Sequence, residues 1–199
     1  MKLNRIEKLL MNNPFRSAAQ RREAALLEQL GGRTTGARVL EIGCGRGVGT
    51  ELIFERFGAA SVQAFDLDDD MVARARRRLR DYPADRLQLA VGDATAIDAP
   101  DAAFDAVFDF AIVHHVPDWR AAVREVRRVL RPGGRFFFEE VTLHALQRWS
   151  YRTFLEHPTH DRFSGETFIA ELERQGLRVA DRFAHRCFGD FVFGVGVRE

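Results

Sequence analysis

The segment VLEIGCGRGVG at residues 39–49 constrains the fold of this chain more than any other feature. Its apolar start is typical of a buried strand, and its alternating glycines indicate a tight turn that opens into a helix. Glycine lacks a Cβ atom and accepts positive φ angles, so a ligand can approach the backbone of such a turn closely. The helix that follows directs its unpaired N–H groups toward the same place. The segment therefore predicts a site for a nucleotide-like cofactor.

The spacing of these glycines argues against a dinucleotide. A dinucleotide-binding turn follows the pattern Gly-x-Gly-x-x-Gly. The third glycine is replaced by Val48 when the pattern is counted from Gly43, and by Thr50 when it is counted from Gly45. Glu41 also lies inside the strand, where a carboxylate would repel a pyrophosphate and attract a ligand that carries amine and sulfonium cations. An NAD(P)-dependent oxidoreductase is therefore a disfavoured alternative.

Further polar residues follow at the ends of later strands. Asp66 ends the second predicted strand, 23 residues after Gly43, where a carboxylate can accept both hydroxyl groups of a ribose. Asp93 follows the third predicted strand in a Gly-Asp turn, and the pair His114-His115 follows the fourth. Ligands of open α/β sheets bind beyond the carboxyl ends of the strands, so we expect these residues to meet at one edge of the sheet.

The ordered motifs resemble those of the class I S-adenosylmethionine (SAM)-dependent methyltransferases. The His-His pair is similar to the small-molecule branch of that family, which includes quinone and sterol methyltransferases. The resemblance spans roughly residues 38–141 and ends with the segment LRPGGR at residues 130–135. The Asn/Asp-Pro-Pro-Tyr box of nucleic-acid amino-methyltransferases is absent from the sequence. This absence counts against a nucleic-acid acceptor.

The resemblance implies SAM as the cofactor and S-adenosylhomocysteine as the product. It implies that Met71 packs on the adenine, that Asp93 lies near the adenine amino group, and that the N–H of Ala94 binds a ring nitrogen. The cofactor contacts that we expect are Glu41, Gly43, Cys44, Gly45, Gly47, Asp66, Leu67, Met71, Asp93, Ala94, Asp109 and Phe110.

The candidate catalytic residues follow the fourth and fifth predicted strands. The sulfonium methyl group is already activated, so the protein must mainly hold the acceptor in line behind it. A general base is needed only when the acceptor must lose a proton, and histidine titrates in a suitable range for that role. The candidates are His115, which we favour, His114, Glu140 at the end of strand 135–141, and Tyr151 in a predicted lid.

The alternation of strands and helices predicts an α/β fold. We expect a Rossmann-like, doubly wound sheet of about seven strands, mostly parallel, with helices on both faces. A C-terminal antiparallel hairpin should join strands 177–188 and 191–198 through a type II′ turn at Gly189-Asp190. The expected single domain, 1–199, comprises an N-terminal helical cap (1–32), a SAM-binding core (38–141), a substrate lid (142–164) and a C-terminal helix and hairpin (165–199).

Composition narrows the classes of partner that we expect the chain to bind. Its formal net charge of +1 carries no signature of nucleic-acid binding, and no apolar run approaches the ~20 residues of a membrane span. Two cysteines without metal-ligand spacing indicate a reducing compartment, so we expect a cytoplasmic protein and no metal site.

The sequence leaves the acceptor open. A small molecule is favoured, and its reacting atom is O, N or C. A lipid or quinone at the membrane surface is an alternative, because residues 1–22 are basic and amphipathic and residues 136–154 are rich in aromatic side chains. A SAM-binding module without catalytic activity is a further alternative, since a fold does not determine a function. The oligomeric state is open as well.

Overall fold

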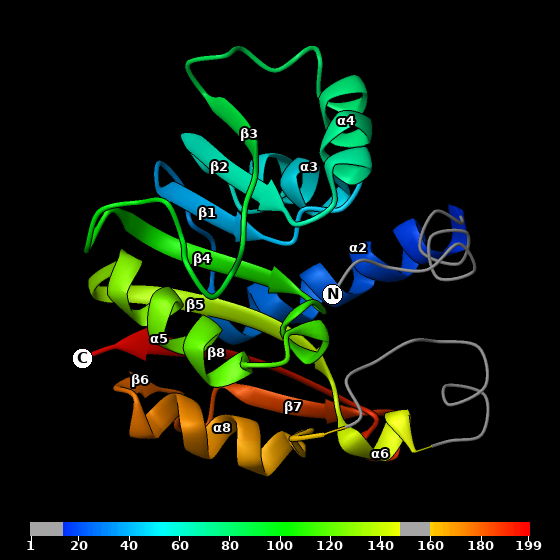
Figure 1. The fold of residues 1–199 in the computed structure, drawn as a ribbon, viewed down its shortest axis with the longest axis vertical. Helices are drawn as coiled ribbons and strands as arrows, with labels where there is room; N and C mark the ends of the chain where they lie inside the picture. Colours follow the sequence, from blue (N-terminus) through cyan, green and yellow to red (C-terminus); the bar gives the residue numbers. More distant parts are fainter. Residues whose placement is uncertain (1–13, 148–159) are drawn as a thin grey trace.

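A central β-sheet with helices on both faces organises the computed structural model, which describes residues 14–147 and 160–199 (Figure 1). Its elements, in chain order, are α2 (Pro14–Gly31), β1 (Arg38–Ile42), α3 (Val48–Glu55), β2 (Ser61–Asp66), α4 (Asp69–Arg78), β3 (Leu87–Val91), β4 (Phe104–Phe110), the 3-10 turn η1 (Val113–His115), α5 (Trp119–Val129), β5 (Leu130–Val141), α6 (Leu143–Leu146), α8 (Gly165–Arg174), β6 (Leu177–Arg178), β7 (Phe183–Arg186), the 3-10 turn η2 (Cys187–Gly189) and β8 (Phe191–Arg198).

The sheet has the strand order β3-β2-β1-β4-β5-β8-β6, and β7 also pairs with β8. The strands β1 to β5 pair in parallel, whereas β8 is antiparallel to β5. One edge of β8 is occupied by β5, so β6 and β7 share the other edge and the sheet has seven positions. The predicted doubly wound, mostly parallel α/β sheet is confirmed. Its order reverses beside β1, which places the carboxyl ends of β1 and β4 at the crevice where ligands of such sheets bind.

The C-terminal hairpin differs from its prediction in two ways. Its first strand is not continuous over residues 177–188 but is divided into β6 and β7. Glu173 of α8 accepts a hydrogen bond from the N–H of Ala180, whose φ is 53°, and this contact keeps the intervening residues out of the ladder. The connection to β8 is the turn η2, with positive φ at Cys187 and Phe188, instead of a type II′ turn.

The fifth strand also begins earlier than expected, at Leu130 instead of Arg135. The register passes from Leu130 opposite Phe104 to Arg135 opposite Ala106, so residues 131–134 form a bulge. The early start extends the contact between β4 and β5, the two strands whose carboxyl ends carry most of the candidate catalytic residues.

Side chains alternate between two apolar layers, one on each face of the sheet. Phe136 and Phe138 of β5 pack with residues of α5 and α8, whereas Phe137 packs with residues of α2 and α3. The Phe137 ring stacks on that of Phe108 with the centroids 4.4 Å apart. Because both faces are covered, a polar side chain near the end of a central strand is buried whichever way it points.

Candidate functional site

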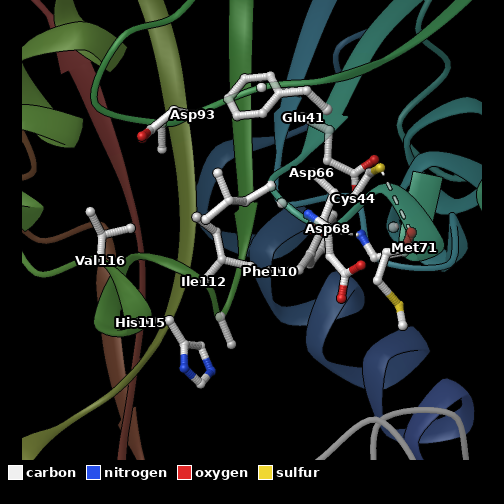
Figure 2. Close-up of a pocket in the computed structure, with 18 of the residues that line it drawn as sticks. Glu41, Cys44, Asp66, Asp68, Met71, Asp93, Phe110, Ile112, His115 and Val116 are labelled. Atoms are coloured by element: carbon white, nitrogen blue, oxygen red, sulfur yellow. Dashed lines mark hydrogen bonds between the residues drawn. The ribbon is translucent and has the colours of Figure 1, made fainter. Parts of the chain in front are cut away.

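A cavity of about 400 Å³ lies at the carboxyl ends of β1, β2 and β4. Figure 2 shows Cys44, Asp66 and Met71 on one side of it, and His115 and Val116 on the other. The residues that we expected to contact a cofactor all line the cavity except Gly47 and Asp109. The predicted motifs are therefore brought to one place, as the topology of the sheet requires.

The glycine turn is shaped by close packing as well as by backbone conformation. Gly43 has a φ of 70°, and a Cβ atom there would lie 2.4 Å from the side chain of Ile112. A Cβ atom at Gly49, in the first turn of α3, would lie 2.1 Å from a carboxylate oxygen of Glu41. Gly47 caps α3 with a φ of 86°. These glycines let the turn pass between β1 and the residues that follow β4.

Glu41 is a buried acid in the wall of the cavity. Its carboxylate accepts a hydrogen bond from the hydroxyl of Thr50 in α3. Burial raises the pKa of Glu41 from 4.5 to about 8, and the negative charges of Asp66 and Asp109 act in the same direction. The Thr50 hydroxyl opposes them. A ligand with a positive charge would favour the ionised form of Glu41, whereas an anionic ligand would be repelled by it.

Asp66 joins the end of β2 to the glycine turn. Its Oδ2 accepts a hydrogen bond from the N–H of Gly45 at 2.8 Å, and its Oδ1 accepts one from the N–H of Asp68 at 2.9 Å. Asp68 in turn caps α4 by accepting the N–H of Asp70. Both aspartates line the cavity, and Asp68 has the additional role of helix cap.

The turn that follows β3 and the helix α4 also contribute residues to the wall of the cavity. Asp93 accepts hydrogen bonds from the N–H and the hydroxyl of Thr95, both at 2.8 Å, and this closes the turn around Ala94. Met71 is buried and lines the cavity, whereas Leu67 is exposed at its rim. These residues give the cavity an apolar wall, a carboxylate and a backbone N–H, groups that suit a purine base.

Comparison with known proteins identifies the region that carries these features. Residues 39–134 match a family model described as a methyltransferase domain. A probable SAM-dependent methyltransferase of Mycolicibacterium smegmatis is 35% identical over 162 residues, which make up 81% of this chain and 60% of the relative. Residues 39–134 form a class I SAM-dependent methyltransferase domain. The cofactor of this family is SAM.

Two further similarities concern the sequence and the fold. The sterol 24-C-methyltransferase erg6 of Aspergillus fumigatus is 36% identical over 124 residues, or 62% of this chain and 32% of the relative. A solved SAM-dependent methyltransferase from Aquifex aeolicus shares the fold with a TM-score of 0.73 and 20% identity, and the match covers 98% of both chains. The present chain spans between about one third and three fifths of the length of these curated relatives.

On the side opposite Glu41, the methyltransferase domain presents the residues that follow β4. Ile112, His115 and Val116 line the cavity, and all three come from the turn that leads into α5. The half-buried imidazole of His115 is the one candidate base that the structure places at the cavity among the described residues. Its companion His114 points away and is buried, with Nδ1 2.6 Å from a carboxylate oxygen of Glu140.

Glu140 and Asp109 do not line the cavity, which differs from our expectation that they contact substrate or cofactor. Both are fully buried under residues 111–115, which we call the β4–α5 turn. Glu140 accepts hydrogen bonds from the N–H groups of Val113 and His114, and Asp109 accepts one from the N–H of Ile112. The sequence shows that Glu139 and Glu140 point to opposite faces, but helices cover both faces, so neither carboxylate reaches the cavity.

Several cavity residues were missed by the sequence interpretation. Ile112, Phe65 and Val116 provide apolar wall, whereas Gln20 of α2 and Arg46 of the glycine turn add polar groups. Some of these residues could have been identified from a neighbouring motif, since Ile112 and Val116 lie on either side of the His-His pair. No such signal marks Gln20, because α2 reaches the cavity only through the tertiary fold.

Tyr151 and most of the predicted lid lie outside the described residues. Within residues 14–147 and 160–199, no group of three His, Cys, Asp or Glu side chains could hold a metal ion. Cys44 lines the cavity, but burial and the charges of Glu41 and Asp66 raise the pKa of its thiol far above the usual value. This thiol is therefore a poor nucleophile.

Proposed function

We propose that this methyltransferase domain transfers a methyl group from SAM to a small-molecule acceptor. The observation that carries the proposal is the set of three carboxyl groups from adjacent strands around one cavity: Glu41 in its wall, Asp66 at a strand end and Asp93 in a turn. In this proposal Asp66 binds the ribose, and Asp93, Ala94 and Met71 surround the adenine. Bound SAM supplies an electrophilic methyl group on a positively charged sulfur.

Glu41 has the charge that discriminates among cofactors. A SAM molecule brings an ammonium and a sulfonium group, and a buried carboxylate close to either gains more from Coulomb attraction than an exposed one would. Burial and the nearby charges of Asp66 and Asp109 raise the pKa of Glu41, and the group that opposes this rise is the uncharged hydroxyl of Thr50. A dinucleotide would instead bring phosphate charges to this acid. The electrostatics of the cavity thus favour SAM over NAD(P).

The reaction requires positioning before it requires proton transfer. An acceptor held in line behind the methyl group, at near-attack distance, gains several kcal/mol from orientation alone. The cavity wall formed by Ile112, His115 and Val116 is where we place the acceptor. The imidazole of His115 accepts a proton there if the acceptor is an alcohol, phenol or ammonium group; a carbon nucleophile that loses its proton later would not need it in the transfer step.

The binding part of the proposal is tested by calorimetry. SAM and NADH should be titrated separately into the protein, and only SAM should bind. Asp66→Asn removes the charge from the proposed ribose ligand and should weaken SAM binding at least about tenfold, because hydrogen bonds to charged groups contribute about 1.5–3 kcal/mol. Asp105→Asn is the matched control, since Asp105 lies at the amino end of β4 and bonds to the N–H of Arg38. Binding of NADH without SAM would show that the cofactor assignment is wrong.

Catalysis and acceptor class need a second experiment. Formation of S-adenosylhomocysteine should be followed across alcohols, phenols, amines, sterols and quinones. No turnover with any of them, despite SAM binding, would favour the binding-module alternative. The sterol methyltransferase among the relatives is the reason to include lipid acceptors. No helix of the described residues has the length and hydropathy to cross a membrane. Co-sedimentation with anionic liposomes separates a membrane-bound acceptor from a dissolved one.

A further inference from the structure

We propose that Glu140 is a positioning residue for the cavity: with Asp109 it holds the β4–α5 turn in the conformation that presents Ile112 and His115 to the cavity. The inference rests on the proposed function, because it assumes that this cavity is the SAM site. Neither carboxyl group touches the cavity itself. Their effect on ligands is therefore exerted through the turn.

The two carboxyl groups bind three consecutive N–H groups of the turn. Asp109 accepts the N–H of Ile112 at 2.9 Å, and the two oxygens of Glu140 accept the N–H groups of Val113 at 2.7 Å and His114 at 3.1 Å. Glu140 also contacts Nδ1 of His114 at 2.6 Å. The first N–H groups of a helical turn have no partner within the turn, so these carboxylates satisfy donors that would otherwise be buried without a bond.

The turn needs such support because its backbone is in a disfavoured conformation. Ala111 has a φ of 64°, a left-handed value that a residue with a Cβ atom rarely adopts. This conformation directs Ile112 onto the glycine turn, where its side chain fills the space that a Cβ atom at Gly43 would need. His115 reaches the cavity from the same turn. A change in the turn would therefore move both side chains in this wall of the cavity at once.

The charge distribution of the pair suits this role. Burial raises the pKa of Asp109 well above its usual value, and the neighbouring Glu140 raises it further. Burial raises the pKa of Glu140 to about 7 and the charge of Glu139 adds to the rise, whereas hydrogen bonds from Asp109, Val113 and His114 lower it. The hydrogen bond between the two carboxyl groups therefore favours the proton on Asp109 and the negative charge on Glu140.

The first test uses the wild-type protein without ligand. Amide hydrogen exchange measured by NMR should show protection of at least about 100-fold at Ile112, Val113 and His114, as expected for amides with buried partners. Residues of an unsupported turn would exchange at rates close to those of a free peptide. Exchange of that kind at these three amides would overturn the inference, and this result does not depend on whether any variant folds.

The second test compares matched variants. Glu140→Gln keeps the size of the side chain but turns one oxygen into an N–H donor that faces other donors. We expect exchange in residues 112–114 to accelerate at least about tenfold and the dissociation constant for SAM to rise about fivefold to tenfold, with core amides still protected. Asp109→Asn should have a smaller effect, since an amide can still accept the N–H of Ile112. Glu171→Gln, at a buried carboxylate of α8 that binds Arg174, is the control and should leave SAM binding unchanged.

The outcomes separate this inference from the proposed function. If the wild-type protein fails to bind SAM, the proposed function is wrong. If the wild-type protein binds SAM and Glu140→Gln binds it equally well with unchanged exchange in the turn, the positioning role is wrong. Acceleration spread evenly over the whole core would also contradict it, because that result indicates a general loss of stability. Once an acceptor is known, a fall in kcat larger than the rise in KM would add support.

Discussion

Replacement of Glu41 by glutamine should stabilise the protein in the absence of SAM while weakening its binding of SAM. The side chain is buried and its pKa rises from 4.5 to about 8 on folding. Between these pH values the folded protein holds a proton that the unfolded chain has released. The free energy of unfolding therefore falls as the pH rises through this window. Glutamine keeps the shape and can still accept the Thr50 hydroxyl, but it has no proton to lose.

The size of the effect follows from the shift. Each pH unit above 4.5 lowers the free energy of unfolding by about 1.4 kcal/mol until the pKa of Glu41 in the folded protein is approached. The free energy of unfolding of the wild-type protein is then lowered by about 2 kcal/mol at pH 6 and by about 4 kcal/mol at pH 8. For a chain of this size 1 kcal/mol corresponds to about 2–4 °C in Tm. The gain in Tm from Glu41→Gln should therefore grow by roughly 4–8 °C between pH 6 and pH 8.

Thermal unfolding of the ligand-free protein, followed by circular dichroism at both pH values, measures this gain. Glu125→Gln is an informative control because its hydrogen bonds with Arg128 lower the pKa of Glu125, so this substitution should destabilise the protein. A gain for Glu41→Gln that is the same at pH 6 and pH 8 would refute the argument, and so would a loss at both. In the wild-type protein, SAM binding below pH 8 should release a proton, which calorimetry in buffers of different ionisation enthalpy detects.

Two other substitutions test the cavity by isothermal titration with SAM. Gly43→Ala should abolish measurable binding because its Cβ would lie 2.4 Å from Ile112, whereas Gly36→Ala, with a similar φ of 75° and nothing within 4 Å, should lower Tm and leave SAM affinity unchanged. Thr50→Val removes the bond that lowers the pKa of Glu41, so SAM affinity should fall at pH 8 and recover above pH 9; an equal loss at both pH values would contradict this reasoning.

The strands β1 to β4 were predictable because each is an apolar run that ends in a residue with a local role. Gly43 after β1 and Asp66 at the end of β2 terminate their strands through turn geometry and backbone bonds that depend on nearby residues. The broken hairpin was not predictable in the same way. It depends on Glu173 of α8 holding the N–H of Ala180, and no local pattern in residues 177–188 shows that contact.

The candidate site shows the same difference between features that local sequence predicts and features that depend on the tertiary fold. Cofactor contacts could be proposed from sequence because they come from short motifs at fixed positions relative to the strands. The role of Glu140 could not, because it is defined by a turn on another part of the chain: Glu140 accepts the N–H of Val113, 27 residues earlier. Asp109 accepts the N–H of Ile112, three residues later, but the sequence does not show that its side chain turns toward that N–H and not toward the cavity. A carboxylate at a strand end suggests contact with a ligand. In this fold the same placement also allows it to bind the N–H groups of a neighbouring turn.

The clustering of acids is the feature that connects sequence, stability and function. Glu41, Asp66, Asp109 and Glu140 lie at or near the carboxyl ends of β1, β2, β4 and β5, which are neighbours in the sheet. The net charge of +1 conceals this concentration, because the balancing bases lie elsewhere along the chain. Parallel pairing brings the four acids to one edge, and burial keeps three of them from ionising freely. A cationic cofactor would offset the free-energy cost of burying these acids only when it is bound. The ligand-free protein is therefore less stable by that amount.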